Sequence, residues 1–78
     1  MSKETTYKAF TIRSTPRQLH DSMRWTPSIV IDWERDGAVT ERPFSASTLY
    51  PTESEADIHG LIHGMRIIDG HVPGFSVD

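Results

Sequence analysis

Hydrophobic and polar residues alternate in three stretches of the first fifty positions, over about residues 7–13, 25–34 and 39–48. Successive side chains of a strand point to opposite faces of a sheet, so this alternation is typical of strands with one buried face. The pattern therefore predicts three strands. Their inward-facing residues are expected to be Phe10, Ile12, Trp25, Pro27, Ile29, Ile31, Trp33, Phe44 and Ala46.

Turn residues between these stretches indicate how the strands connect. Asp36-Gly37 is a strong signal for a two-residue hairpin, because both central positions of such a turn need positive φ. Pro43 has no N–H for a sheet ladder, which places the third strand at an edge. Residues 14–24 contain Pro16 and are expected to form an irregular extension of the first hairpin, either mobile or functional.

A helical pattern begins after Pro51 and ends near Gly70. Thr52 and Glu55 form a capping box, in which each residue satisfies a backbone N–H of the other, and Gly70 has the left-handed freedom that ends helices. The apolar positions cover more of the helix than one sheet face requires, and two of them are glycines of the kind that admit a close neighbour, either the sheet or a second helix. The apolar positions form two groups. One is a stripe of Ile58, Leu61, Met65 and Ile68 with Ile62 on its flank, and the other is a second side of Ala56, Gly60, Gly64 and Ile67.

Together these elements predict an α+β fold, a three-stranded antiparallel β-meander with one C-terminal helix packed on one face (β-β-β-α). With 78 residues, the chain has room for one domain. We expect that domain to span residues 7–70, preceded by a polar, disordered N-terminus over residues 1–6 and followed by a C-terminal tail over residues 71–78.

Composition excludes several classes of site and location. The chain has no cysteine, which removes disulfides and thiolate metal sites together. Its N-terminal residues lack the apolar run of a signal peptide, and no apolar stretch approaches the roughly 18 residues that span a membrane. The expectation is a soluble cytoplasmic protein without membrane contacts.

The charge is unevenly distributed, and this leaves nucleic-acid binding as an alternative function. The formal net charge is −3, yet residues 1–24 carry five basic and two acidic side chains. A nucleic-acid-binding module using the sheet or this basic N-terminal part would need a basic or aromatic surface. By strand parity, the face away from the helix carries Tyr7 as its single aromatic residue, and Asp32 and Glu34 lie on its central strand, so nucleic acid is the less favoured partner.

The polar residues include few groups with the spacing of a catalytic or metal site. His59 and His63 stand four apart and can face one ion, but no further ligand or neighbouring base has a matching spacing, so the expected arrangement is a polar helix arc completed by Arg66. Neither a nucleophile elbow nor a phosphate-binding glycine loop is present in the sequence. The sequence predicts no enzyme activity, no cofactor and no metal.

The excess of apolar residues on the helix predicts an interaction surface. It comprises Ile58, Leu61, Ile62 and Met65, with Trp25 as a possible hot spot or, more simply, a core residue. In a monomer some of these side chains are exposed unless the loop or residues 71–78 cover them, and a symmetric dimer through helix faces or the first strand's edge would bury them. The predicted function is a non-enzymatic protein-interaction or self-association module.

The order of these features also resembles a family of short uncharacterised bacterial proteins with a β-β-β-α fold. The resemblance covers about residues 7–70. It implies the fold and no assigned activity. The matching segments are Tyr7-Lys8, Trp25, Ile29 to Ile31, Phe44-Ser45-Ala46, Pro51-Thr52-Glu53-Ser54-Glu55-Ala56 and Arg66-Ile67-Ile68-Asp69-Gly70.

Overall fold

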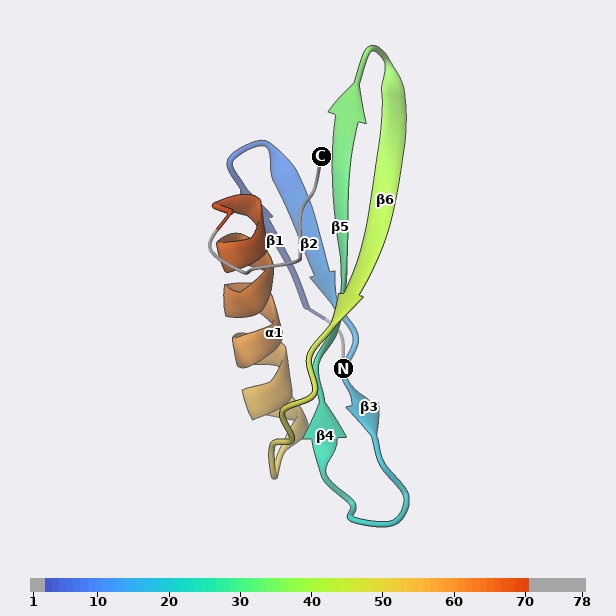
Figure 1. Cartoon of the computed structure of the whole chain (residues 1–78), viewed down its shortest axis with the longest axis vertical. Helices are drawn as coiled ribbons and strands as arrows, with labels where there is room; N and C mark the ends of the chain where they lie inside the picture. The colour runs from blue at the N-terminus through green and yellow to red at the C-terminus, as the bar shows by residue number, and fades with distance from the viewer. Residues whose placement is uncertain (1–2, 71–78) are drawn as a thin grey trace.

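The computed structural model describes residues 3–70, in which a helix lies across one face of a four-stranded antiparallel sheet (Figure 1). The strand order in this sheet is β1-β2-β5-β6, and β3 and β4 form a small ladder of their own. The α+β class and the C-terminal helix are confirmed, whereas the three-stranded meander is wrong by one strand. The elements are β1 (Lys3–Tyr7), β2 (Phe10–Ser14), β3 (Arg17–Gln18), β4 (Trp25–Thr26), β5 (Ser28–Arg35), β6 (Ala38–Ser45) and α1 (Glu53–Ile68).

The additional strand, β1, comes from the N-terminal segment predicted to be disordered. Residues 3–7 pair antiparallel with β2, and the chain reverses at Lys8 and Ala9, which both have positive φ (50° and 68°). The prediction of disorder over residues 1–6 is therefore wrong for residues 3–6. It failed because β1 is an edge strand whose exposed side chains need no apolar alternation, and because Lys-Ala is not a recognised turn sequence.

The segment predicted to be an irregular loop over residues 14–24 is also more regular than expected. Its strand β3 pairs with β4, and the backbone N–H of Leu19 donates to the carbonyl of Arg24 at 2.8 Å. The predicted second strand is divided at Pro27 into β4 and β5. Proline has no N–H with which to continue the ladder, which accounts for the break.

The β5–β6 hairpin follows the sequence prediction closely. Asp36 (φ 54°) and Gly37 (φ 80°) form the two-residue turn, with Arg35 paired to Ala38. Strand β6 lies at the sheet edge, as Pro43 predicted, but ends at Ser45 rather than near residue 48. This hairpin projects beyond the other strands and beyond the helix (Figure 1).

Both ends of α1 have the predicted chemistry. The backbone N–H of Glu55 donates to Thr52 Oγ1 at 3.1 Å, which is one of the two hydrogen bonds of a capping box. At the other end Gly70 (φ 76°) donates its N–H to the carbonyl of Ile67 at 3.0 Å. The left-handed conformation there is open to glycine without steric cost, so the helix ends where the sequence predicted.

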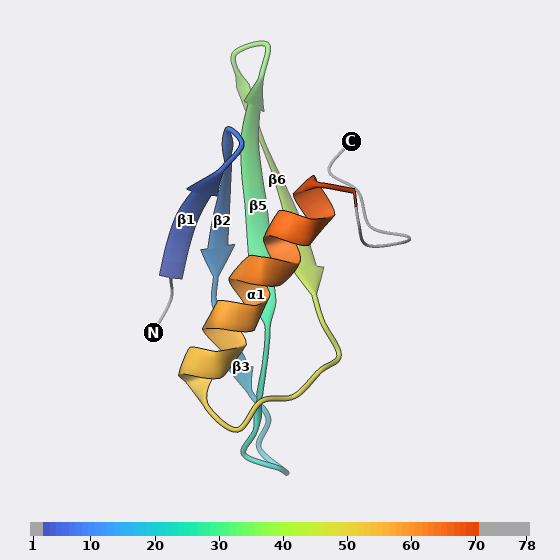
Figure 2. The ribbon, with the colours of Figure 1, turned by 90° about the vertical axis from the view of Figure 1, so that its left-hand side faces the viewer.

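The core forms where α1 crosses the sheet, which it does diagonally in Figure 2. Its fully buried side chains are Ile12, Ile29, Ile31 and Ile67. The helix presents its small residues to the sheet: a Cβ built on Gly64 would lie 2.9 Å from Ile12 Cγ2, and one on Gly60 would lie 3.2 Å from Ile29 Cγ2. The two glycines thus admit the sheet. The second apolar side of the helix therefore makes the closest contact with the sheet. The predicted stripe of larger apolar residues lies at the edge of this contact.

Candidate functional site

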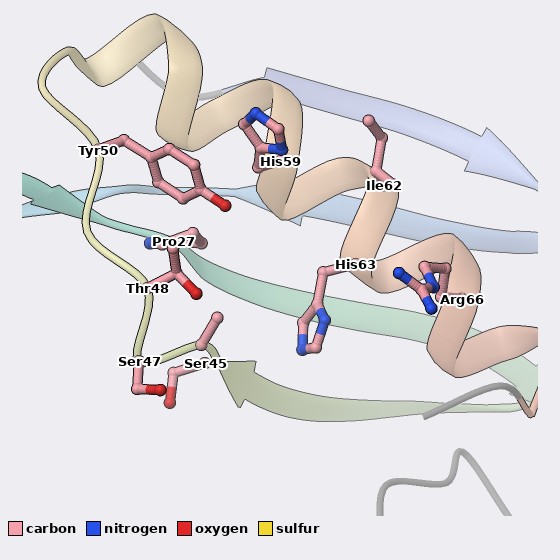
Figure 3. A pocket seen from close by; sticks show the side chains of 10 residues that line it. Pro27, Ser45, Ser47, Thr48, Tyr50, His59, Ile62, His63 and Arg66 are labelled. Atoms are coloured by element: carbon pink, nitrogen blue, oxygen red, sulfur yellow. The ribbon is translucent and has the colours of Figure 1, made fainter. Parts of the chain in front are cut away.

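The main groove of the described chain lies between α1 and the segment that follows β6 (Figure 3). It has a volume of about 620 Å³, within the range of small-molecule sites. Its lining residues are Pro27, Ser45, Ala46, Ser47, Thr48, Tyr50, His59, Ile62, His63 and Arg66.

One wall of the groove is the polar arc of α1. His59, Ile62, His63 and Arg66 are spaced three and four apart, which places their side chains on one side of the helix. In Figure 3 the side chain of His63 points from the helix into the space that faces residues 45–50. The sequence pattern predicts His59, His63 and Arg66 on the polar arc of the helix, but it does not predict the segment that lies opposite them.

The opposite wall is held by hydrogen bonds and a ring contact. Trp25 and Tyr50 exchange two backbone hydrogen bonds of 2.8 Å, and Thr26 Oγ1 donates to the carbonyl of Ala46 at 2.7 Å. The Tyr50 ring stacks on His59 with 4.5 Å between ring centroids and 7° between planes. These contacts fix the segment after β6 against both the sheet and the helix.

The electrostatics of the groove differ from those of the whole chain. Its lining includes Arg66 and several hydroxyl groups but neither aspartate nor glutamate, although the formal net charge of the protein is −3. Burial lowers the pKa of His63, and the nearby guanidinium of Arg66 lowers it further. The groove therefore offers hydrogen-bond donors and one permanent positive charge.

His59 and His63 are the pair of residues whose spacing allows them to face one metal ion. Residues 3–70 contain no group of three or more His, Cys, Asp or Glu side chains placed to hold a metal ion. The ring of His59 is engaged with Tyr50. The pair spaced four apart is thus part of the groove wall.

The residues predicted to form an interaction surface are distributed over different places. Ile58 and Ile62 lie on the outer face of α1, with 47% and 46% of their surface exposed. Leu61 and Met65 are half-buried against the core. Trp25 is half-buried in β4. Only the two isoleucines of that set form an exposed apolar site.

The sheet face away from the helix is polar. At its centre Arg13 forms ion pairs with Asp32, at 3.1 Å between Nε and Oδ2, and with Glu41. Tyr7, predicted on this face, instead lies on the helix side, where its hydroxyl donates to Asp69 Oδ2 at 2.8 Å. The reversal at Lys8 and Ala9 changes the strand parity and accounts for that error.

Comparisons with protein-family models, curated proteins and solved structures find no match. The resemblance to short bacterial β-β-β-α proteins therefore stays a prediction. Within residues 3–70, no helix has both the length and the apolar character needed to cross a membrane.

Proposed function

We propose that this protein is a non-enzymatic self-association module in which two copies pair through the outer faces of α1, in antiparallel orientation. The observation that carries the proposal is the exposure of Ile58 and Ile62 (47% and 46%) between an acidic and a basic residue of the same helix. Residues four apart are neighbours on a helix surface, so a second helix packed on this side would remove both isoleucines from water together.

The four residues concerned form one stripe. Glu55, Ile58, Ile62 and Arg66 are spaced three, four and four residues apart, so they follow one side of a helix with 3.6 residues per turn. Glu55 and Arg66 are separated by about 16 Å along the axis, at 1.5 Å per residue. They lie at equal distances from the middle of α1, which spans Glu53–Ile68.

This symmetry favours the antiparallel arrangement. A two-fold axis through the middle of the stripe brings Glu55 of each copy next to Arg66 of the other, with Ile58 and Ile62 of both copies between the ion pairs. A parallel arrangement would place like charges together. Opposed helix dipoles add to the preference.

The interaction is expected to be weak. Burying the exposed half of one isoleucine contributes about 1 kcal/mol, taking half of the 1.5–3 kcal/mol for a whole side chain. A single helix face is also much smaller than a standard interface of roughly 800 Å² per partner. We therefore expect a dissociation constant of roughly 0.1–1 mM.

A charge-reversal pair tests the arrangement. Glu55→Lys and Arg66→Glu should each weaken self-association, because each variant places like charges next to one another in its own dimer. An equimolar mixture of the two should associate at least as well as the wild type, since both ion pairs then join opposite charges. Sedimentation equilibrium across the expected dissociation constant measures all four samples.

Ile62→Asp should likewise give a monomer, and Val39→Asp is its control. Val39 is 66% exposed on the projecting hairpin, so it tests the effect of removing an exposed hydrophobic residue elsewhere. Circular dichroism verifies that each variant is folded. A monomeric wild type at millimolar concentration, or a mixture no better than its components, would contradict the proposal.

A further inference from the structure

We propose that the groove between α1 and residues 45–50 binds a small organic molecule through a phosphate group. This inference does not require self-association, but the two proposals share Ile62 and Arg66, which line the groove and also belong to the stripe proposed to pair. The test is therefore made with the monomer. Its basis is a groove lining that has hydrogen-bond donors on both walls, one guanidinium and no carboxylate.

The donors come from two elements that the fold brings together. The helix contributes Arg66 and His63, and the opposite segment contributes the hydroxyl groups of Ser45, Ser47 and Thr48. In Figure 3, Thr48 and His63 point into the same space from opposite walls. A ligand placed there can accept hydrogen bonds from both walls at once.

This donor set matches a phosphate better than it matches a carboxylate or a cation. A guanidinium can bind two phosphate oxygens, and hydroxyl donors on the facing wall can reach the others. A carboxylate has only two oxygens in one plane, so it would leave one wall unsatisfied. A cation would meet Arg66 and no lining acidic group.

The groove also has room for the organic part of such a ligand. Pro27, Ala46 and Ile62 give the lining an apolar portion beside the donors. The volume of about 620 Å³ exceeds what a phosphate ion alone requires. The wall is fixed before binding, because Tyr50 is tied to Trp25 through the backbone and to His59 through ring stacking. A preformed wall reduces the entropy lost on binding.

A bound anion should also change the pKa of His63. Burial and the charge of Arg66 lower the pKa of His63. The other titratable groups of the lining are His59 and Tyr50, and neither aspartate nor glutamate lines the groove. A phosphate beside the ring would favour the protonated form and so raise the His63 pKa.

The test is an NMR titration of the full chain, at a protein concentration below the expected dimer dissociation constant. The probes are phenyl phosphate, inorganic phosphate, benzoate and sodium chloride at matched ionic strength. Phenyl phosphate should shift the amide signals of residues 45–50 and 63–66 in a saturable way and raise the His63 pKa. Inorganic phosphate should bind the same residues more weakly.

Two variants and a control make the assignment specific. Arg66→Gln and Thr48→Val should each weaken phenyl phosphate binding about tenfold or more, the usual loss for a hydrogen bond to a charged group. Arg35→Gln, which removes a positive charge at the far end of β5, should leave binding unchanged. Dispersed amide spectra verify that the variants fold.

Four results would each overturn the proposal. They are shifts no larger with phenyl phosphate than with chloride, equal binding of benzoate, equal loss in Arg66→Gln and Arg35→Gln, and an unchanged His63 pKa at saturation.

Discussion

Ser14 on β2 donates a hydrogen bond of 2.7 Å to Asp57 Oδ1 on α1, and both residues are buried, with 0% and 1% of their surface exposed. The two are 43 positions apart in the sequence. A buried polar group is stabilising only when its partner is present, so this hydrogen bond favours one position of the helix on the sheet.

We expect Ser14→Ala to lower the free energy of unfolding by about 1–3 kcal/mol, because it leaves a buried carboxylate without this donor. Asp57→Ala should cost a similar amount. The double variant should cost less than the sum of the two, since the second substitution then removes a group that has already lost its partner. Urea unfolding of the four proteins measures the coupling, and strict additivity would show that the two residues act independently.

Gly64→Ala should be destabilising, and Gly60→Ala should be close to neutral. The new methyl group at Gly64 would meet Ile12 Cγ2 at 2.9 Å, an atom attached directly to a rigid branched carbon. Overpacking of this kind costs about 1–3 kcal/mol, more than the helix propensity of about 1 kcal/mol that alanine adds. At Gly60 the nearest contact is 3.2 Å, so the two effects nearly cancel. Thermal unfolding of both variants gives the comparison, and equal losses would disprove this explanation.

Ala9→Gly should stabilise the protein by about 0.5–1 kcal/mol. Ala9 has φ 68°, a conformation that costs an L-residue more than it costs glycine. Ala38→Gly, at the first position of β6, is the control and should destabilise by a similar amount. A rise in the melting temperature for the first variant and a fall for the second is the expected result. A fall for both would show that the β1–β2 turn is unstrained.

His63 should make stability depend on pH in a defined direction. Burial and Arg66 lower its pKa in the folded state below the ordinary value of 6.5, so the unfolded chain takes up its proton first as pH falls. The contribution of His63 to the free energy of unfolding is fully present above pH 6.5. It decreases as the pH falls below 6.5, and the decrease stops once the pH is below the folded-state pKa. His63→Gln should remove this component. The free energies of unfolding of wild type and variant are measured by urea unfolding from pH 8 to 4.5. Their difference gives the contribution of His63, because the titration of carboxylates affects both proteins equally. A difference that does not change with pH would contradict the prediction.

The sequence alone determined the elements whose signals are local. Thr52, Glu55 and Gly70 set the ends of α1, and Asp36-Gly37 set the β5–β6 turn, because capping and turn conformations depend on a few neighbouring residues. Alternation identified the core strands through Ile12, Ile29 and Ile31. These local features are sufficient to predict the α+β class.

Only the tertiary structure decided what depends on distant partners. Strand β1 has little apolar pattern and becomes a strand by pairing with β2, with Tyr7 and Lys8 joined to Asp69 at the end of α1. The helical periodicity of α1 predicts two apolar sides, and either could face the sheet. The side with Gly64 does so, because a residue without a Cβ leaves room for Ile12. The groove needed the segment after β6 to lie opposite His63, and that placement depends on the pairing of Tyr50 with Trp25, 25 residues away. Contacts between residues so far apart leave no periodic signal in the chain, which is why the sequence predicted the helix arc but not the groove.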